Sequence, residues 1–334
     1  MNIKKFVVKT SFNGLNKLVI CFCLFLNCVI STNLHAKPSN ETLQELNNSV
    51  LRVKVKLANG HLGLGSAVVI SKNETVTNCH VVNNATQIDV IVNGQALKAT
   101  AIKADWHHDL CLLTVENLNV PAVKLGASKS LQYHSSFFTV GYPDDTQTPV
   151  NTFGAVKSLF PMDNSVIIQA SSPFKLGASG GGAFDDVGNL VGIIAVKSTG
   201  NMPNYYYLPV EWVQALMTKP AQALGAKSEK PFWAMAAIER PYFMQVVKPY
   251  IAQDWKTLLK LATFWVQAEP NTAESWFYLA AAEYANNDLD LAQTHFKKVL
   301  TLNNQHTQAS EYLEKLALKL ANINTPLKQV ALMN

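Results

Sequence analysis

The sequence predicts a multidomain chain in which an all-β domain is followed by a small all-α domain. With 334 residues, the chain is long enough for two domains. Short apolar segments bounded by turn residues are typical of strands and continue to a helix-like segment that ends near Met217. From about Phe232 the apolar residues recur with a helical period. Between the two patterns, Thr218 to Pro231 is rich in lysine, alanine and proline and holds one glycine, so we interpret it as a linker.

The first 36 residues are typical of an export signal. Four lysines precede an apolar stretch from Leu18 to Ile30, and a polar end follows, so we expect cleavage after Ala36. An uncleaved membrane anchor is the alternative, but about 13 apolar residues are short for a bilayer span. The expected mature chain is periplasmic or secreted, has no stable membrane span, and comprises residues 37–217, the linker 218–231, a helical domain 232–322 and a tail 323–334.

The composition indicates a folded protein without an electrostatic partner. Hydrophobic residues make up 48% of the chain and charged residues 15%. The formal net charge of +5 comes largely from the signal, which holds four of the 28 basic residues and no acidic one. The mature chain keeps 24 basic and 23 acidic residues, and this balance does not indicate binding to nucleic acid or to an anionic membrane.

The most informative segment is the glycine-rich run from Gly177 to Gly182, which contains Ala178 and Ser179. A serine among glycines on a tight turn can present its hydroxyl beside free backbone N–H groups, as a nucleophile with an oxyanion hole requires. Because glycine-rich turns are common, the run alone is read more readily as a flexible loop.

Two upstream segments favour the nucleophile. His80 lies in TNCHVV, at the exit of a strand-like stretch, and Asp109 precedes an apolar strand that would bury its carboxylate. Histidine, aspartate and serine then follow one another in the order of the chymotrypsin-type triad. Asp105 is a competing acid, and His107 and His108 are competing bases, although neither histidine starts from a buried strand end.

The segment from about Ser49 to Met217 resembles a trypsin-like serine protease of the bacterial HtrA/Deg type. Six segments carry the resemblance in the family's order: GLGSA, TNCHVV, HHDLCLL, VGYP, the stretch from Gln169 to Gly182, and LVGII. The resemblance implies a chymotrypsin-like double β-barrel that hydrolyses peptide bonds in polypeptide substrates through an acyl-enzyme. It implies no metal and no organic cofactor.

The resemblance also assigns roles to single residues. Ser179 would be the nucleophile, His80 the general base and then acid, and Asp109 the group that fixes the histidine tautomer. The backbone N–H groups of Gly177 and Ser179 would form the oxyanion hole, with about 3 kcal/mol per donor. The sequence departs from the family at Ala178, where the bacterial branch usually has asparagine, so this loop has one side-chain anchor fewer. Digestive-type trypsins have aspartate there to pair with a new N-terminus, and activation by that route is not expected.

The resemblance places the substrate-binding residues less sharply. The base of the specificity pocket is expected at Ser172 and Pro173, and its walls at Ala195, Val196, Lys197 and the Tyr205 to Tyr207 strand, with Tyr206 facing the substrate. No acidic residue falls at the base, so cleavage after lysine or arginine is disfavoured and a small or medium apolar side chain is expected. The alternative for the three tyrosines is an ordinary barrel strand.

Two cysteines remain after the signal, Cys79 and Cys111. Contact between His80 and Asp109 would bring their strands within disulfide reach, so we predict a Cys79–Cys111 bridge. The alternative is a pair of buried thiols, and the spacing suggests no metal site.

The helical domain resembles a tetratricopeptide repeat. The similarity is carried by Trp276, Leu279, Ala280, Tyr284, Ala292 and Phe296. Pro270 would end a preceding unit whose second helix covers residues 254–267, while Glu283 and Asn304 depart from the pattern. A generic helical hairpin packed on the protease is the alternative. A repeat array would offer a surface for a protein partner or substrate, in the place where HtrA proteins usually carry a PDZ domain.

We therefore expect an exported serine endopeptidase whose helical domain recruits a substrate or partner. One alternative is an inactive protease-fold scaffold that acts through the helical domain, and Ala178 is the local reason to keep it. An esterase with the same triad is a lesser alternative, because ester and amide hydrolysis share the acyl-enzyme step.

Overall fold

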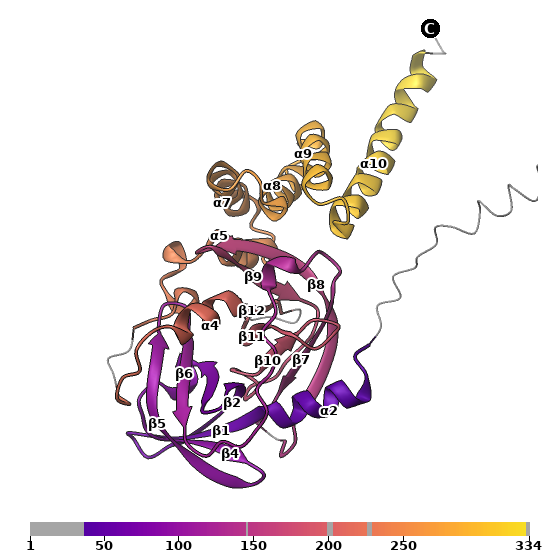
Figure 1. Cartoon of the computed structure of the whole chain (residues 1–334). Helices are drawn as coiled ribbons and strands as arrows, with labels where there is room; N and C mark the ends of the chain where they lie inside the picture. The colour runs from indigo at the N-terminus through magenta and orange to yellow at the C-terminus, as the bar shows by residue number, and fades with distance from the viewer. Residues whose placement is uncertain (1–36, 145, 199–202, 226–228, 332–334) are drawn as a thin grey trace, which may run out of the picture. The chain divides into compact units, whose positions relative to one another are not determined.

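The computed structural model describes residues 37–144, 146–198, 203–225 and 229–331, with side chains up to residue 321 (Figure 1). The predicted export signal, residues 1–36, lies outside the described residues. Within the described part of the chain, no helix is both long and apolar enough to cross a membrane. The described residues from Lys37 onward belong to one compact unit.

Two closed antiparallel barrels of six strands each follow the first helix, α2 (Asn40–Ser49). The first barrel has the order β1-β2-β3-β6-β5-β4. Its strands are β1 (Val50–Leu57), β2 (Leu62–Ser71), β3 (Glu74–Asn78), β4 (Ala85–Val92), β5 (Gln95–Asp105) and β6 (Leu110–Val115). The second barrel has the order β10-β11-β12-β9-β8-β7. Its strands are β7 (Ser136–Gly141), β8 (Val150–Met162), β9 (Ser165–Ala170), β10 (Gly182–Phe184), β11 (Leu190–Lys197) and β12 (Tyr205–Pro209). The predicted double β-barrel is confirmed.

Short polar turns set the register of neighbouring strands. Asn93 and Gly94 join β4 to β5, and Asp163 and Asn164 join β8 to β9, all with positive φ. Two consecutive residues of this kind make a turn whose twist matches that of the strands beside it. Asp163 is thereby fixed at the end of the second barrel.

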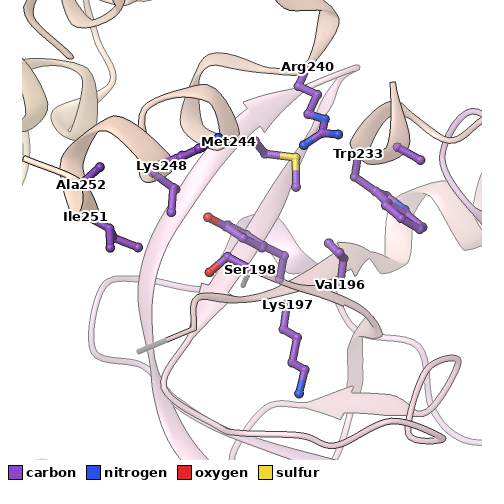
Figure 2. A pocket seen from close by; sticks show the side chains of 12 residues that line it. Val196, Lys197, Ser198, Trp233, Arg240, Met244, Lys248, Ile251 and Ala252 are labelled. Atoms are coloured by element: carbon purple, nitrogen blue, oxygen red, sulfur yellow. The ribbon is translucent and has the colours of Figure 1, made fainter. Parts of the chain in front are cut away.

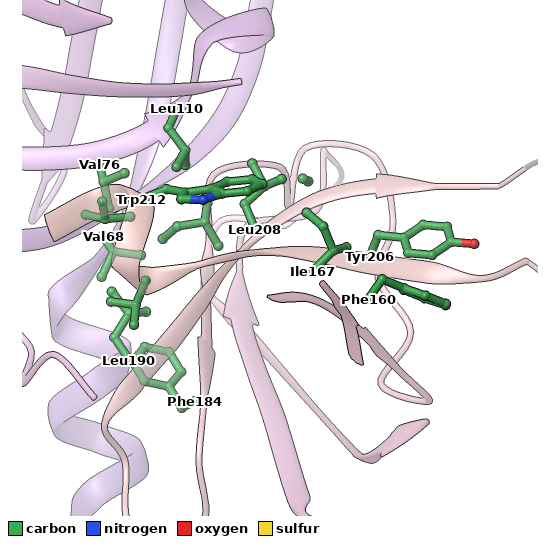
Figure 3. Packing of buried hydrophobic residues seen from close by; sticks show 14 of the residues in the cluster. Val68, Val76, Leu110, Phe160, Ile167, Phe184, Leu190, Tyr206, Leu208 and Trp212 are labelled. Atoms are coloured by element: carbon green, nitrogen blue, oxygen red, sulfur yellow. The ribbon is translucent and has the colours of Figure 1, made fainter. Parts of the chain in front are cut away.

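The two barrels share a buried core around helix α4 (Val210–Met217) (Figure 3). Trp212 of α4 lies between Leu110 of the first barrel and Leu208 of the second. The Trp212 indole N–H donates to the Asp163 carbonyl oxygen at 3.1 Å, which satisfies its polar end. This packing fixes the angle between the two barrels.

The described residues of the segment predicted as a linker contact the first barrel. Gln222 and Ile102 exchange two backbone hydrogen bonds, of 2.7 and 2.9 Å, and Leu224 packs on the core of that barrel. The Phe232 N–H then donates to the His107 carbonyl oxygen at 3.0 Å. The chain is thus held against the first barrel before the helical region begins.

The region after the barrels is helical, as predicted. It starts with the short turn η2 (Phe232–Ala234), a second short turn η3 (Ala237–Glu239), and the helices α5 (Tyr242–Gln245) and α6 (Val247–Ile251). Four longer helices follow: α7 (Trp255–Ala268), α8 (Ala273–Ala285), α9 (Leu289–Leu302) and α10 (Thr307–Ala331). Helix α7 lies within one residue of the predicted helix at 254–267, and α10 extends through most of the predicted tail.

The helical region packs on strand β8 of the second barrel. Phe160 of β8 stacks on Phe243 of α5 at 4.4 Å between ring centroids and contacts Trp265 of α7 at 6.2 Å. A second contact lies just before helix α10, where the ring of His306 stacks on that of Tyr133, which precedes β7, with 5.9 Å between ring centroids. These contacts bury large aromatic rings, so the helices are part of the folded body.

Candidate active site

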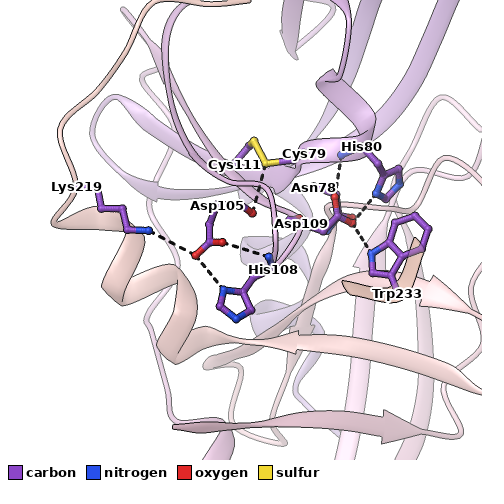
Figure 4. The surroundings of a disulfide bond; sticks show 9 residues. All are labelled: Asn78, Cys79, His80, Asp105, His108, Asp109, Cys111, Lys219 and Trp233. Atoms are coloured by element: carbon purple, nitrogen blue, oxygen red, sulfur yellow. Dashed lines mark hydrogen bonds and ion pairs between the residues drawn. A yellow bond between two sulfur atoms is a disulfide. The ribbon is translucent and has the colours of Figure 1, made fainter. Parts of the chain in front are cut away.

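Strands β3 and β6 bring His80 next to Asp109 (Figure 4). The short helix α3 (Cys79–Val82) starts where β3 ends, and Asp109 directly precedes β6. His80 Nδ1 lies 2.6 Å from Asp109 Oδ2, and the His80 backbone N–H donates to Asp109 Oδ1 at 2.8 Å. This arrangement places the ring proton on Nδ1 and leaves Nε2 as the acceptor.

The carboxylate of Asp109 is buried, whereas the imidazole of His80 is partly exposed to solvent. The side chain of Asp109 is 1% exposed and that of His80 is 32% exposed. The Asp109 carbonyl oxygen accepts from the Asn78 amide at 3.1 Å and from the Cys79 N–H at 3.2 Å. The backbone turn at Asp109, with a φ of +58°, is therefore fixed from the opposite strand.

The predicted Cys79–Cys111 disulfide is confirmed (Figure 4). The two Cα atoms lie 5.0 Å apart. Since Cys79 precedes His80 and Cys111 lies two residues after Asp109, the bridge ties together the two segments that carry the histidine and the aspartate.

The glycine-rich loop that carries Ser179 is held against the first barrel. Gly180 has a φ of +87°, and a Cβ there would lie 2.1 Å from the Ser66 carbonyl oxygen, so only glycine fits. The Ser66 N–H donates to the Ser179 carbonyl oxygen at 2.8 Å, and the Ser66 hydroxyl donates to the Gly177 carbonyl oxygen at 2.9 Å. The sequence analysis did not single out Ser66, which appeared there only as one letter of the GLGSA motif.

The expected oxyanion-hole donors are the backbone N–H groups of Gly177 and Ser179. Among the hydrogen bonds of the described residues, neither group donates to a protein acceptor. The Ser179 hydroxyl donates to the Ala195 carbonyl oxygen at 3.4 Å, and within the described chain no hydrogen bond joins it to His80. Catalytic hydrogen bonds are often long or misaligned before substrate binds.

Ala178 points into the second barrel. It is buried, and its Cβ would lie 3.0 Å from a Cβ built on Gly141. Its carbonyl oxygen accepts from the Gly181 N–H at 2.9 Å. The loop is therefore anchored at this point by packing and by the backbone, without a polar side chain.

A cavity of about 380 Å³ lies beside this loop and is the candidate specificity pocket. Of the residues predicted for the pocket, Pro173 and Lys197 line it. Tyr205 lines it in place of Tyr206, because neighbouring residues of a strand point to opposite faces. The described residues that form its wall include no aspartate or glutamate: Thr139, Gly141, Pro143, Thr146, Val150, Thr152, Pro173, Phe174, Lys175, Ala178, Ile194, Lys197 and Tyr205.

The other predicted pocket residues lie nearby but outside this cavity. Ser172 is buried, and its hydroxyl donates to the Thr152 carbonyl oxygen at 2.9 Å. Ala195 is buried and accepts from Ser179. Val196 and Tyr206 line a second cavity. These four predicted positions therefore lie around the first pocket and do not line it.

The second cavity, of about 660 Å³, lies between the end of β11 and the helical region (Figure 2). Val196, Lys197 and Ser198 form one side of it, and Trp233, Arg240 and Met244 are among the residues of the other. Strand β11 pairs with β10 only as far as Ile193, so one edge of its last residues has no strand partner among the described residues. An extended peptide can add to an edge of this kind.

Trp233 is a second site residue, besides Ser66, that the sequence analysis did not identify. Its indole N–H donates to Asp109 Oδ2 at 3.1 Å, and its ring meets the His80 ring at 5.5 Å and 89°, edge to face (Figure 4). Trp233 lies 124 residues after Asp109, in the part assigned to the helical domain. No local pattern connects residues so far apart in the sequence.

The competing candidates form a separate cluster. His108 Nδ1 lies 3.0 Å from Asp105 Oδ2, and His108 Nε2 lies 3.0 Å from Asp163 Oδ2. The His108 ring packs on Trp212 at 3.9 Å. Since Asp105 belongs to the first barrel and Asp163 to the second, His108 bridges the two barrels.

This cluster also contains the donor atoms that most resemble a metal site. His107, His108 and Asp163 offer ligand atoms within 4.8 Å of one another, and among the described residues they are the group of three that does so. Both ring nitrogens of His108 already bond to carboxylates, so we interpret the cluster as an ion-pair bridge.

The charges in the cluster support that interpretation. Burial raises the pKa of Asp105, but the hydrogen bond and positive charge of His108 outweigh burial and bring this pKa down from 3.8 to about 2. Burial lowers the pKa of His108, but the carboxylates of Asp105 and Asp163 outweigh it, so that this pKa lies above its ordinary 6.5.

Comparison with known proteins agrees with this architecture. Residues 65–193 match the family described as the trypsin-like peptidase domain. A probable periplasmic serine endoprotease, DegP-like, from Halomonas elongata is 33% identical over 156 residues, which is 44% of this chain and 33% of the relative. The periplasmic serine endoprotease DegP of Salmonella typhimurium is 31% identical over 170 residues, 47% of this chain and 36% of the relative. The chain thus spans about a third of the length of these curated relatives.

A solved structure shows the same fold. The crystal structure of a protease from M. tuberculosis in its active form superposes with a TM-score of 0.50 at 19% identity, over 58% of this chain and 90% of that one. The residues that match the family model include His80, Asp109 and Ser179. Residues 65–193, which carry these three residues, therefore resemble a trypsin-like peptidase domain in sequence and in fold.

Proposed function

We propose that the protein is a serine endopeptidase that cleaves polypeptides through an acyl-enzyme at Ser179. The observation that carries the proposal is the 2.6 Å contact between His80 Nδ1 and the buried carboxylate of Asp109. A carboxylate in this position stabilises the imidazolium that forms when His80 takes a proton from serine.

The reaction begins when the Ser179 hydroxyl turns from Ala195 to His80. Ser179 Oγ attacks the substrate carbonyl carbon while its proton passes to His80 Nε2, and the carbonyl oxygen becomes an oxyanion facing the N–H groups of Gly177 and Ser179. The C–N bond then breaks, and His80 gives the proton to the leaving amine. Water repeats the sequence on the acyl-enzyme, so that the acid is released and Ser179 regains its proton.

The proposed location is the periplasm. The two relatives described above are named periplasmic, and their names place the same kind of domain outside the cytoplasm. The Cys79–Cys111 bridge supports this location, because disulfides persist in oxidising compartments. The proposed export signal would deliver the chain there.

The proposed residue before the cleaved bond is small or medium and apolar. The candidate specificity pocket has no acidic residue in its described wall, and Lys175 and Lys197 lie at it. A lysine or arginine side chain in this cavity would find no counter-charge.

The proposed role of the helical region is recruitment of a substrate or partner. Phe277 and Phe296 pack among Ala280, Ala281 and Ala292, as large residues pack into small-residue positions of a tetratricopeptide-like array. The second cavity opens between this region and the unpaired edge of β11. A substrate segment on the amino side of the cleaved bond would lie along that edge.

A fluorophosphonate probe tests the proposal. Activated serines react with it, so we expect the intact mass of the mature protein to rise by one probe adduct, and that of Ser179→Ala to stay unchanged. The inactive scaffold is the second candidate, and the bond from Ser179 to Ala195 rather than to His80 favours it. A folded wild-type protein that takes no label would decide for the scaffold.

A further inference from the structure

We propose that Trp233 is a positioning residue for the Asp109–His80 pair, so that the region after the barrels supplies part of the active site. This inference rests on the proposed serine-protease chemistry. It starts from the 3.1 Å hydrogen bond that the Trp233 indole donates to Asp109 Oδ2.

The donors around the Asp109 carboxylate explain why one more matters. Oδ1 accepts the His80 backbone N–H at 2.8 Å, and Oδ2 accepts His80 Nδ1 at 2.6 Å. Both of these donors belong to His80 itself, so without Trp233 the carboxylate would be held only by the residue that it orients. The indole is therefore the donor, among the described residues, that holds the carboxylate independently of the residue it has to orient.

The backbone before Trp233 is well anchored. The neighbouring Phe232 is buried and packs near Trp212, with ring centroids 6.4 Å apart. Its N–H donates to the His107 carbonyl oxygen, two residues before Asp109. The loop that carries Asp109 and the turn that carries Trp233 are thus bonded to each other twice, once through backbone and once through the indole.

The Trp233 ring also limits the freedom of His80. The two rings meet edge to face, 5.5 Å apart.

The hydrogen bond from Trp233 to Asp109 is made to a buried charged group. Such a bond is stronger than one in water, because the surroundings screen it less. Trp233 thereby acts on the chemistry through Asp109 and His80 rather than by touching the reacting atoms.

The Asp109–His80 pair is therefore coupled to the region after the barrels through Trp233. Trp233 lies outside residues 65–193, the part that matches the trypsin-like peptidase domain. It lines the second cavity together with Arg240 and Met244. A ligand or partner that displaced this wall would remove the third donor from Asp109 and slow the acylation step.

Three variants of the mature full-length protein test the role. W233F keeps an aromatic ring without a donor, and W233H restores an N–H, since Nε2 of histidine occupies the same place in its ring as Nε1 of tryptophan. W276F is the matched control, because Trp276 donates its N–H to the Pro270 carbonyl oxygen, away from Asp109. Thermal unfolding shows which variants are folded.

The readouts are the downfield proton resonance of the His80 Nδ1–H, identified by its loss in H80A, and the kcat and KM for a peptide substrate. We expect W233F to shift or broaden the resonance and to lower kcat by roughly ten- to a hundredfold with KM unchanged. W233H should recover part of both, and W276F should match the wild type.

Several results would overturn the inference. One is a W233F protein with the wild-type resonance and kcat, and another is an effect of W276F as large as that of W233F. If W233F does not fold, a folded W233H with the wild-type resonance supports the role, and one that has lost it argues against it. Because the resonance needs no turnover, a wild-type protein that cleaves no peptide would count against the proposed function and leave this comparison decisive.

Discussion

The side chain of Ser66 holds two segments of the opposite barrel at once. Its hydroxyl donates to the Gly177 carbonyl oxygen at 2.9 Å and accepts from the Tyr142 N–H at 2.8 Å. Ser66 is fully buried on β2, so water cannot replace it. The first barrel thus sets the conformation of the loop that presents Ser179.

Replacing Ser66 with alanine should lower the stability of the fold and also impair the site. Two buried backbone groups would lose a partner, at about 1–3 kcal/mol each. We expect the fluorophosphonate labelling rate to fall by about tenfold, since the loop geometry relaxes. Ser71→Ala is the control, because Ser71 is on the same strand and its hydroxyl donates to Glu74, which is its one side-chain hydrogen bond among the described residues. Equal labelling rates for both variants would show that the loop holds its conformation without Ser66.

Loss of the Cys79–Cys111 bridge should lower stability markedly. The bridge joins residues 32 positions apart, and the chain-entropy estimate for a loop of this size is about 4 kcal/mol. We expect a lower unfolding midpoint for the Cys79→Ser, Cys111→Ser double variant, and slower labelling of Ser179. Thermal unfolding with and without a reductant measures the effect. A reductant that changes the wild type and leaves the variant unchanged confirms that the bridge is responsible.

Stability should depend on pH through the ion pairs that His108 makes with Asp105 and Asp163 between the barrels. The pKa of His108 is raised, so the stability it contributes is full below about 6.5, its unfolded value, and is lost as pH rises through its folded pKa. The pKa of Asp105 is lowered to about 2, so its contribution is full above 3.8 and is lost as pH falls toward 2. The cluster therefore stabilises the fold most between about pH 3.8 and pH 6.5.

Unfolding midpoints at pH 6 and pH 9 check the histidine part of this prediction. We expect the wild type to lose stability over this interval and His108→Gln to lose less, since glutamine has no charge to lose. An identical pH dependence in the two proteins would remove His108 as the cause. His61→Gln serves as the control, because His61 is exposed and its side chain makes no ion pair among the described residues.

Cleavage should follow small and medium apolar residues and avoid lysine and arginine. The described wall of the specificity pocket contains Lys175 and Lys197 and no acid. Lys175→Glu should therefore admit basic residues that the wild type rejects, by partial charge compensation. Mass spectrometry of a digested peptide library gives the preference directly. Frequent cleavage after arginine by the wild type would contradict the assignment of this cavity.

The sequence was sufficient where a feature is local. Short motifs that resemble the protease family predicted the double barrel, and the expected contact between His80 and Asp109 predicted the disulfide between Cys79 and Cys111. Contacts between distant segments have no such pattern. Gln222 pairs with Ile102 and Trp233 bonds to Asp109 only because the chain returns to the first barrel. The choice between Tyr205 and Tyr206 depended on a one-residue register, which apolar alternation leaves open in a run of three tyrosines.

The return of the chain to the first barrel changes how the molecule comes apart. The chain leaves the second barrel at α4, is paired to Ile102 at Gln222, and is bonded to His107 at Phe232 before the helices begin. The helices in turn rest on Phe160 of the second barrel. The first barrel, the second barrel and the helical region thus each contact the other two. They should unfold in a single cooperative transition, so that the catalytic residues and the helical surface are lost together.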